Sequence, residues 1–233
     1  MSITVKNLTF SYDGKCLVEN LNFDISNSCI GLIKGESGSG KSTLLNVIAG
    51  LKKADSGNVE CNNKVYMDEN TFLPPESRRI GYVFQDFALF PHINAKQNIT
   101  YALNKDFLHT DHITLALNLN DHLHKMPHEL SGGQQQMLAL SKAVLLEPEL
   151  LLIDELSLGL APVVVQDLLK VVEQLKGLGI TMVIVEQSVN VALSIADRAI
   201  FMERGRVQFQ GPAQELLERD DLLRAVFLSG EGA

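Results

Sequence analysis

The sequence has no tryptophan, only three cysteines and no excess of positive charge. Its 233 residues carry a formal net charge of −8 at pH 7. A nucleic-acid-binding protein needs a basic face to neutralise phosphate groups, so this charge argues against a nucleic-acid partner. Cys16, Cys29 and Cys61 lie far apart and in no metal-ligand spacing. Such a sparse, odd number of cysteines is typical of reduced thiols in the cytoplasm.

Long hydrophobic runs are also missing. No stretch approaches the ~18 uninterrupted apolar residues that a membrane-spanning helix needs, so we expect any membrane role to come through a partner. The first ten residues, MSITVKNLTF, lack the basic stretch and the apolar core of a signal peptide. The hydrophobic content of 45% is nevertheless enough for a buried core, and the length permits one large domain or two small ones.

Apolar segments of strand length alternate with helical patterns along most of the chain. Residues 3–34 have the pattern of short strands, with a turn at Asp13-Gly14. The alternation predicts an α/β fold, in which a parallel sheet is covered by helices on both faces. The further expected strands are 58–62, 79–84, 150–153, 180–185 and two within 200–210, and the expected helices are 41–50, 131–146 and 162–176.

Residues 86–128 are polar, rich in asparagine and histidine, and mostly helical in pattern. We interpret them as part of a small helical subdomain, at about 86–146, within a single domain that spans residues 1–233. Five histidines fall within 20 residues of this segment: His109, His112, His122, His124 and His128. No cysteine accompanies them and their surroundings are polar, which favours solvated helix faces over a metal site.

A glycine-rich segment between an expected strand and an expected helix matches the phosphate-loop pattern G-x-x-x-x-G-K-[ST] in full. It reads Gly35, Glu36, Ser37, Gly38, Ser39, Gly40, Lys41, Ser42. The glycines let the backbone curl, so that successive N–H groups point into one hollow at the positive end of the helix. We expect Lys41 to reach the outer phosphates of a nucleotide and the Ser42 hydroxyl to bind Mg²⁺.

Two carboxylates follow the apolar strand expected at residues 150–153. Asp154 is at the position where such a phosphate loop needs an acidic residue to hold Mg²⁺ through water. Glu155 comes next, beside the expected position of the terminal phosphate. A carboxylate there orients and polarises an attacking water molecule. The pair therefore predicts hydrolysis of the bound nucleotide.

The segment Leu130-Ser131-Gly132-Gly133-Gln134 resembles the signature motif of the ABC ATPases. Further positions match the family: Tyr12 for the ring that stacks on adenine, and Gln85 for the glutamine that senses the nucleotide and its metal. The resemblance implies the ABC ATPase fold, a P-loop NTPase core with an antiparallel N-terminal β subdomain and a helical insert. It also implies that Thr43 joins the residues that bind ATP. In the implied dimer, the phosphate loop of one subunit faces Ser131, Gly132, Gly133 and Gln134 of the other.

Three positions depart from the commonest pattern of this family. Leu156 replaces the usual proline, Ala161 replaces the usual aspartate, and Gln187 replaces the histidine that contacts the terminal phosphate. A glutamine amide still donates a hydrogen bond, but it does not titrate near neutrality. We therefore expect Gln187 to give a supporting contact rather than a proton relay. The departures resemble those of the ATPases of branched-chain amino-acid importers.

The resemblance implies an ATPase subunit of an ABC transporter of the importer type, with ATP and Mg²⁺ as cofactors. Its expected partners are a membrane-spanning permease, docked near residues 87–101, and a second ATPase subunit. Its expected place is the cytoplasm, at the inner face of the cell membrane. An alternative is an ATP-gated dimerisation module with little turnover, and another is a soluble ABC protein acting on DNA or ribosomes. The cargo and the choice between homodimer and heterodimer stay open.

The two parts of the chain resemble different relatives. Residues 81–86 and 89–92 are similar to the ATPases of molybdate and other oxyanion importers. Residues 135–140, 157–162 and 186–192 are similar to the branched-chain amino-acid type. One hypothesis is a mosaic joined near the signature motif, either natural or made as an engineered chimera. The other is a single divergent subfamily that mixes both sets of features.

Overall fold

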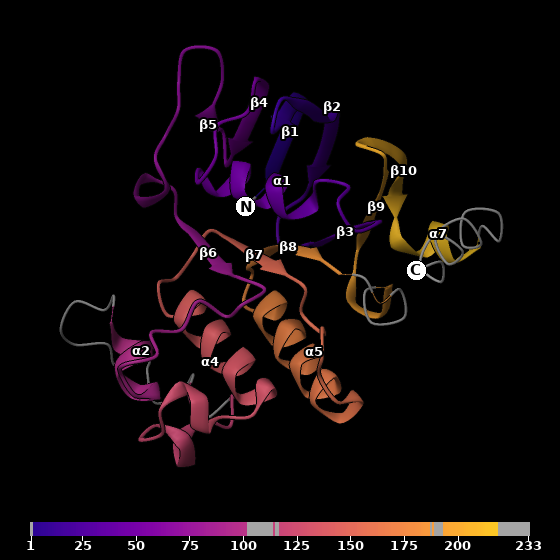
Figure 1. Ribbon diagram of the computed structural model, residues 1–233. Coiled ribbons are helices and arrows are strands. Elements are labelled where there is room, and N and C mark those ends of the chain that lie inside the picture. The colour runs from indigo at the N-terminus through magenta and orange to yellow at the C-terminus, as the bar shows by residue number, and fades with distance from the viewer. Residues whose placement is uncertain (1, 102–113, 115–116, 187, 189–192, 219–233) are drawn as a thin grey trace.

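The computed structural model describes residues 2–101, 114, 117–186, 188 and 193–218. Two sheets organise the fold (Figure 1). The first is antiparallel, in the order β2 (Lys15–Ile25), β1 (Ile3–Tyr12), β4 (Ser56–Cys61), β5 (Lys64–Met67). The second has the order β10 (Arg206–Pro212), β9 (Arg198–Glu203), β3 (Ile30–Gly35), β8 (Thr181–Val185), β7 (Leu150–Asp154), β6 (Ile80–Val83). All neighbours in this second sheet are parallel except β9 and β10.

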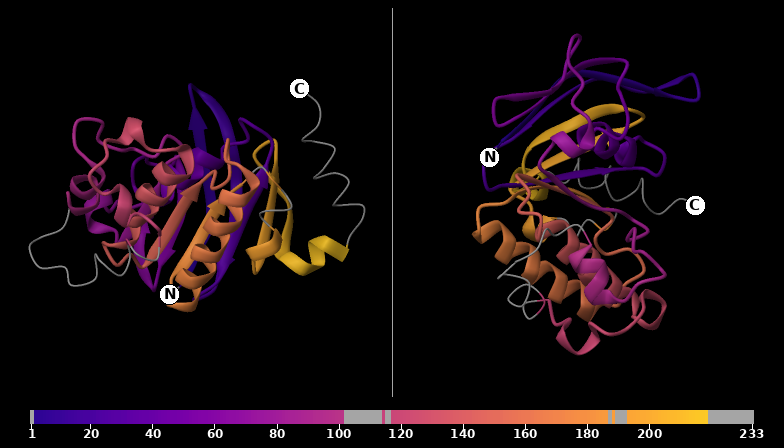
Figure 2. Two further views of the ribbon diagram at one scale, coloured as in Figure 1. Left: turned by 90° about the horizontal axis from the view of Figure 1, so that it is seen from below. Right: turned by 90° about the vertical axis from the view of Figure 1, so that its left-hand side faces the viewer.

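Helices lie on both faces of the six-stranded sheet. Helix α1 (Lys41–Ala49) lies between the two sheets, whereas α4 (Gly132–Val144) and α5 (Pro162–Gly177) cover the opposite face (Figures 1 and 2). The described chain also contains α2 (Ala95–Thr100), α7 (Ala213–Glu218) and the short 3-10 helices Pro75–Ser77, Asn120–His122 and Pro127–Glu129. This layering confirms the α/β class, the antiparallel N-terminal sheet and the helix-covered parallel sheet.

Strand β7 explains why two hydrophobic layers form. Successive side chains of a strand point to opposite faces of its sheet. Leu150 and Leu152 accordingly pack in the layer that contains α1 and the antiparallel sheet. Leu151 and Ile153 pack in the layer that contains α4 and α5. All four are fully buried, and burying one such side chain stabilises the fold by about 1.5–3 kcal/mol.

Some expected elements differ from the structure. Strand β5 is absent from the sequence-based expectations, although Asn62 and Asn63 both have positive φ, at 52° and 62°, and form the turn that leads into it. Between 86 and 128 the described helical residues are α2, residue 114 and the two 3-10 segments, while 102–113 and 115–116 lie outside the described residues, so the mostly helical character stays a prediction. The division into a subdomain at about 86–146 stays a prediction. No helix in the described part of the chain has the length and apolar character to cross a membrane.

Candidate functional site

The loop at residues 35–40 joins the end of β3 to the start of α1. Gly38 and Gly40 have φ values of 77° and 96°, which residues with a side chain rarely adopt. At Gly40 a Cβ atom would also meet Val18 Cγ2 at 2.9 Å. The Gly40 carbonyl accepts the first helical hydrogen bond, from Leu44 N at 2.8 Å. The glycines therefore make the tight entry into α1 possible, and the N–H groups of its first turn face the loop.

Lys41 points back into this loop. Its Nζ donates to the carbonyl oxygens of Gly35 at 2.8 Å and Glu36 at 2.6 Å, and to Ser39 Oγ at 3.4 Å. The residue is only 6% exposed. Burial lowers the pKa of Lys41, while the carboxylates of Glu155 and Asp154 act in the opposite direction. The ammonium group thus lies inside the loop and close to both carboxylates.

A cavity of about 360 Å³ opens over the loop. The residues that line it come from β1, β2, the loop, α1 and the segments after β6 and β7: Tyr12, Leu17, Ser37, Gly38, Gly40, Lys41, Ser42, Thr43, Gln85 and Glu155. Sequence reasoning proposed all of these except Leu17, whose approach depends on the fold of the β1–β2 hairpin. Tyr12 is 58% exposed, and Lys52 Nζ lies 4.6 Å from the centre of its ring.

Asp154 lies at the end of β7, where it is only 5% exposed. The Ser42 hydroxyl donates a hydrogen bond to its carboxylate, and burial raises the pKa of Asp154. Among the described residues, none donates a hydrogen bond to its Oδ1 atom. Asp154 Oδ1 and the Ser42 hydroxyl oxygen form a pair of oxygen atoms, of which the carboxylate oxygen lacks a donor, and Mg²⁺ binds oxygen atoms of these types. The residues present therefore fit this cation, and the Gln85 side chain lines the same cavity.

Glu155 is held in an unusual backbone conformation. Its φ is 59°, in the left-handed region that residues other than glycine rarely occupy. Its N–H donates to the Val185 carbonyl at the end of β8, at 2.9 Å. Such strain costs about 1–3 kcal/mol and is concentrated at functional sites. Here it turns the chain sharply at the end of β7, so that Glu155 lines the cavity while Asp154 stays behind it.

The signature segment begins α4, as expected. Ser131 is the N-cap: its Oγ accepts from Gln134 N at 3.3 Å, and its N–H donates to Gln134 Oε1 at 3.0 Å. A Cβ atom at Gly133 would meet Val164 at 2.4 Å, so the helix start packs directly against α5. None of residues 131–134 lines the cavity over the phosphate loop of its own chain.

The histidines are not uniformly solvated. His124 and His128 are exposed, but His122 is half-buried and its Nε2 lies 2.8 Å from Gln134 Nε2. The expectation of a solvated helix face is therefore wrong for His122, because the 3-10 helix Asn120–His122 places this side chain against the start of α4. His109, His112 and the expected site residue Gln187 lie outside the described residues.

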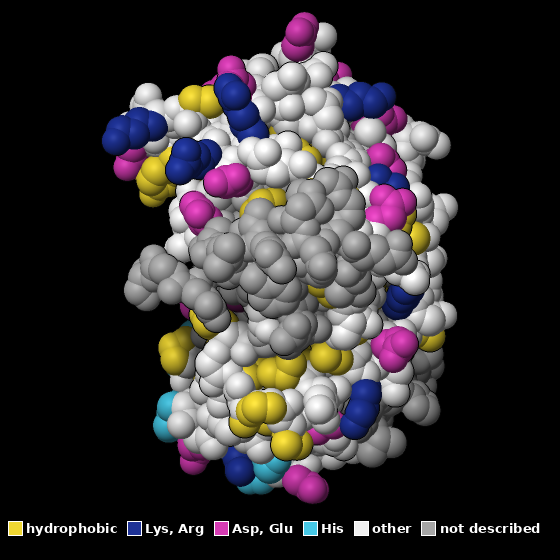
Figure 3. Space-filling view, turned by 90° about the vertical axis from the view of Figure 1, so that its right-hand side faces the viewer, with side chains coloured by type: hydrophobic (Ala, Val, Ile, Leu, Met, Phe, Trp, Pro, Cys, Tyr) yellow, Lys and Arg dark blue, Asp and Glu magenta, His cyan; other side chains and the backbone are white. Residues whose placement is uncertain are grey.

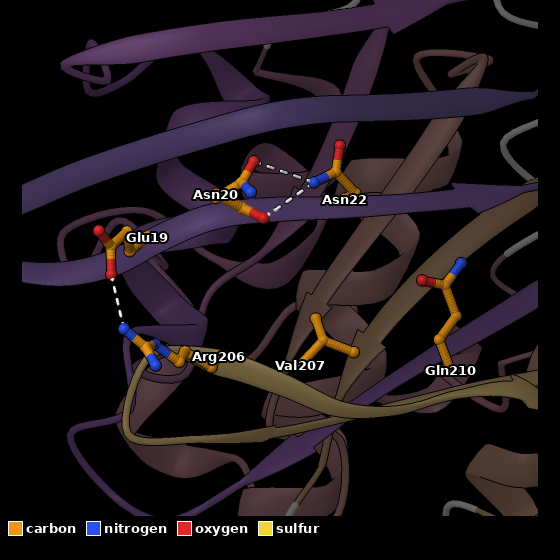
Figure 4. A pocket seen from close by; sticks show the side chains of 6 residues that line it. All are labelled: Glu19, Asn20, Asn22, Arg206, Val207 and Gln210. Atoms are coloured by element: carbon orange, nitrogen blue, oxygen red, sulfur yellow. Dashed lines mark hydrogen bonds and ion pairs between the residues drawn. The ribbon is translucent and has the colours of Figure 1, made fainter.

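A second cavity of about 600 Å³ lies between β2 and β10 (Figure 4). Several of its polar side chains already bond to other lining residues: Arg206 donates to Glu19 at 2.9 Å, and Asn22 donates to the Asn20 carbonyl at 2.8 Å. This second cavity is larger, but no residue of the phosphate loop and, within the ranges that the structure describes, no buried charged side chain lines it. The smaller cavity over residues 35–43 therefore remains the candidate site.

Comparison with known proteins gives consistent results. A model of the ABC transporter family matches residues 18–157. The chain is 33% identical to the spermidine/putrescine import ATP-binding protein PotA of Pasteurella multocida, over 98% of this chain and 63% of that protein. It is 37% identical to the molybdenum import ATP-binding protein ModC of Photobacterium profundum, over 82% of this chain and 55% of that protein. The chain thus spans less than two thirds of the length of these relatives.

A solved structure of an ABC transporter cassette, MJ0796, has the same fold and is dimeric. Its TM-score is 0.79 at 27% identity, over 91% of this chain and 98% of that chain. A second structure of MJ0796, in a post-hydrolysis state, is bound to ADP and Pi. The PotA match extends across both parts of the proposed mosaic. It does not decide between a mosaic and one divergent subfamily, so the mosaic stays a prediction.

Proposed function

This chain belongs to the ABC transporter family, and we propose that it is the ATP-binding and ATP-hydrolysing subunit of an ABC importer. The observation that carries the proposal is the cavity of about 360 Å³, in which the phosphate loop, Gln85 and Glu155 meet. The post-hydrolysis MJ0796 structure with ADP and Pi supports the same chemistry for a cassette of this fold. The similarity to PotA and ModC, which are import ATP-binding proteins, supports the importer class.

Electrostatic stabilisation does most of the proposed chemistry. The N–H groups of the phosphate loop and the Lys41 ammonium group bind the outer phosphates and stabilise the charge that develops during transfer. Ser42, Asp154 and Gln85 would hold Mg²⁺, which neutralises charge on the phosphate oxygens when bound. Glu155 orients the attacking water and accepts its proton. Tyr12 stacks on the adenine ring, and Ser37, Ser39 and Thr43 complete the phosphate contacts.

The active form is proposed to be a dimer with two shared sites. Residues 131–134 lie outside the cavity of their own chain, and their helix start presents N–H groups suited to an anion. In the proposed dimer, Ser131, Gly132, Gly133 and Gln134 of one subunit complete the site on the other. The dimeric MJ0796 structure supports this arrangement. ATP closes the dimer, and hydrolysis with product release reopens it.

The permease is proposed to dock on the segment after β6. Phe90 and Tyr101 have ring centres 4.3 Å apart, and Tyr101 is 66% exposed. Lys142 Nζ, from α4, lies 4.8 Å from the centre of the Phe90 ring, so the segment is held against the helix that begins with the signature. We propose that a loop of the permease contacts this surface and keeps the chain at the inner face of the membrane. Figure 3 shows the side on which β10 and α7 lie, away from this segment, where basic and acidic side chains are interspersed.

Phosphate release from ATP tests the proposal. The chain with Mg²⁺ and ATP should release phosphate, and Glu155→Gln should nearly stop release while ATP binding persists, because the amide does not accept a proton. Glu149→Gln, which changes a carboxylate at the opposite end of β7, is the matched control and should retain the parental rate. ATP binding with no release by the parent would identify a gated dimerisation module instead. No ATP binding would overturn the proposal.

A further inference from the structure

Glu186, the first residue after β8, is a buried carboxylate to which the mechanism above gives no role. It is only 2% exposed. Its Oε2 atom accepts a hydrogen bond from Ser157 N at 3.0 Å, in the loop after β7. Its Oε1 atom accepts from Ser188 N at 2.9 Å, in the loop after β8. One side chain thus joins the two loops that follow neighbouring strands.

The charge of this carboxylate has a nearby counterpart. Lys34, on β3, is 9% exposed, and its Coulombic interaction with Glu186 raises the pKa of Lys34 against the larger lowering effect of burial. A buried charge is costly unless a partner and hydrogen bonds compensate it. Both kinds of compensation are present at Glu186. The Glu186 carboxylate is therefore a buried acceptor for two N–H groups and not a surface group with incidental contacts.

The two loops meet beside Glu155. The strained turn there is joined to the end of β8 by two hydrogen bonds: Glu155 N to the Val185 carbonyl at 2.9 Å, and Ser157 N to Glu186 Oε2 at 3.0 Å. Between them Leu156 is 1% exposed and packs in the core. Because Glu155 is in the left-handed region, its direction depends on the contacts that hold this turn.

We propose that Glu186 is a positioning residue, whose buried carboxylate ties the turn carrying Glu155 to the end of β8 and so keeps Glu155 aimed into the cavity. The inference rests on the proposed function, because it acts through the role of Glu155 in hydrolysis. This role does not require Glu186 to contact the phosphate loop. A change at Glu186 should therefore slow the chemical step more than it weakens ATP binding.

Kinetics of Glu186→Gln test this prediction. The amide has one acceptor oxygen, so it keeps at most one of the two N–H bonds and presents its own N–H groups to the other. We expect kcat to fall about 10-fold or more, as small misplacement of a reacting group commonly does, while the Kd for ATP changes by less than about 2-fold. Glu186→Asp, which keeps both acceptor oxygens, should recover part of the rate. Glu149→Gln is the control, since it neutralises a hydrogen-bonded carboxylate away from the site.

Amide hydrogen exchange of the nucleotide-free protein gives a readout that does not need activity. Peptides covering residues 154–161 should exchange faster in Glu186→Gln than in the parent or in Glu149→Gln, because the Ser157 N–H loses its charged carboxylate acceptor. Unchanged exchange in this segment, or a kcat equal to that of the parent, would overturn the inference. Equal losses in kcat and ATP affinity with a lowered melting temperature would also overturn it, by indicating a general structural role. Faster exchange in a chain that never hydrolyses ATP would contradict the proposed function alone.

Discussion

Among the single residues of the site, Lys41 stabilises the phosphate loop through hydrogen bonds to the backbone of the loop. Its ammonium group bonds the carbonyl oxygens of Gly35 and Glu36, and it is the cation that lies beside Glu155 and Asp154. Truncation of Lys41 removes both these hydrogen bonds and the positive charge that a triphosphate needs. The same side chain therefore shapes the loop and supports its proposed ligand.

Lys41→Ala should weaken ATP binding by roughly 10–100-fold, on the scale of the charge-assisted hydrogen bonds that are lost. Lys53→Ala, which truncates an exposed lysine outside the cavity, is the control and should bind ATP like the parent. Calorimetric titration with ATP measures both. Hydrolysis by Lys41→Ala at the parental rate under limiting ATP would refute the assignment of Lys41.

The residues of the site differ in how far the sequence predicts them. Lys41, Ser42 and Glu155 belong to short motifs whose residues are close together in the sequence. The structure brings all three to one cavity. Leu17 and Glu186 were not predicted as site residues. Leu17 reaches the cavity from β2, and Glu186 bonds the loop after β7 across 29 residues of sequence. Contacts of that kind depend on which strands become neighbours, and local spacing does not encode them.

Arg78 holds together the elements around the end of α1. Its guanidinium donates to Val47 and Ile48 carbonyls at 2.9 and 2.6 Å, to Leu73 O at 2.8 Å and to Tyr66 O at 3.2 Å. The residue is 4% exposed, and burial lowers the pKa of Arg78 to about 10. The bond to Ile48 satisfies a carbonyl group that the end of the helix leaves without a backbone donor. The helix whose start forms the phosphate site is thereby fixed at its other end.

Arg78→Ala should lower the free energy of unfolding by at least about 3 kcal/mol, because a buried side chain is lost and the carbonyl groups of Ile48 and Leu73 lose the guanidinium as donor. The neighbouring Arg79→Ala should change it by less than about 1 kcal/mol, since the Arg79 side chain is 61% exposed and forms a surface ion pair with Glu149. Denaturant titration of the two variants makes the comparison. Similar losses in both would show that Arg78 does not hold the end of α1.

Elements with strong periodicity were predictable. Helix α1 ends at Ala49 and is capped by Gly50, whose φ of 82° is typical of a helix C-cap, and α5 begins at Pro162 as expected. Strand β5 was missed because it has only four residues and depends on β4 for its pairing. The asparagine pair at 62–63 was the available signal, since asparagine tolerates the left-handed region that its turn requires.

At the scale of the whole molecule, the alternation of strands and helices predicted a parallel sheet, but not its strand order. β3 lies between β8 and β9, which are more than 140 residues later in the chain. That order puts the end of β3, which begins the phosphate loop, beside the end of β8 and one strand away from the end of β7, because the three strands run in the same direction. Ligand sites of such sheets lie at the carboxyl ends of the strands. The proposed dimer extends this site to a second subunit.

The shared site requires that ATP drives dimerisation, and light scattering of Glu155→Gln after size exclusion measures this step. The variant removes a negative charge beside the phosphates and blocks turnover, so ATP should trap the closed state. With saturating ATP and Mg²⁺ withheld to block residual turnover, it should elute with twice the 25.6 kDa mass of one chain, and as a single chain without nucleotide. Combining it with Lys41→Ala should abolish the shift. A Glu155→Gln variant that binds ATP yet stays at the mass of one chain would contradict the shared-site account.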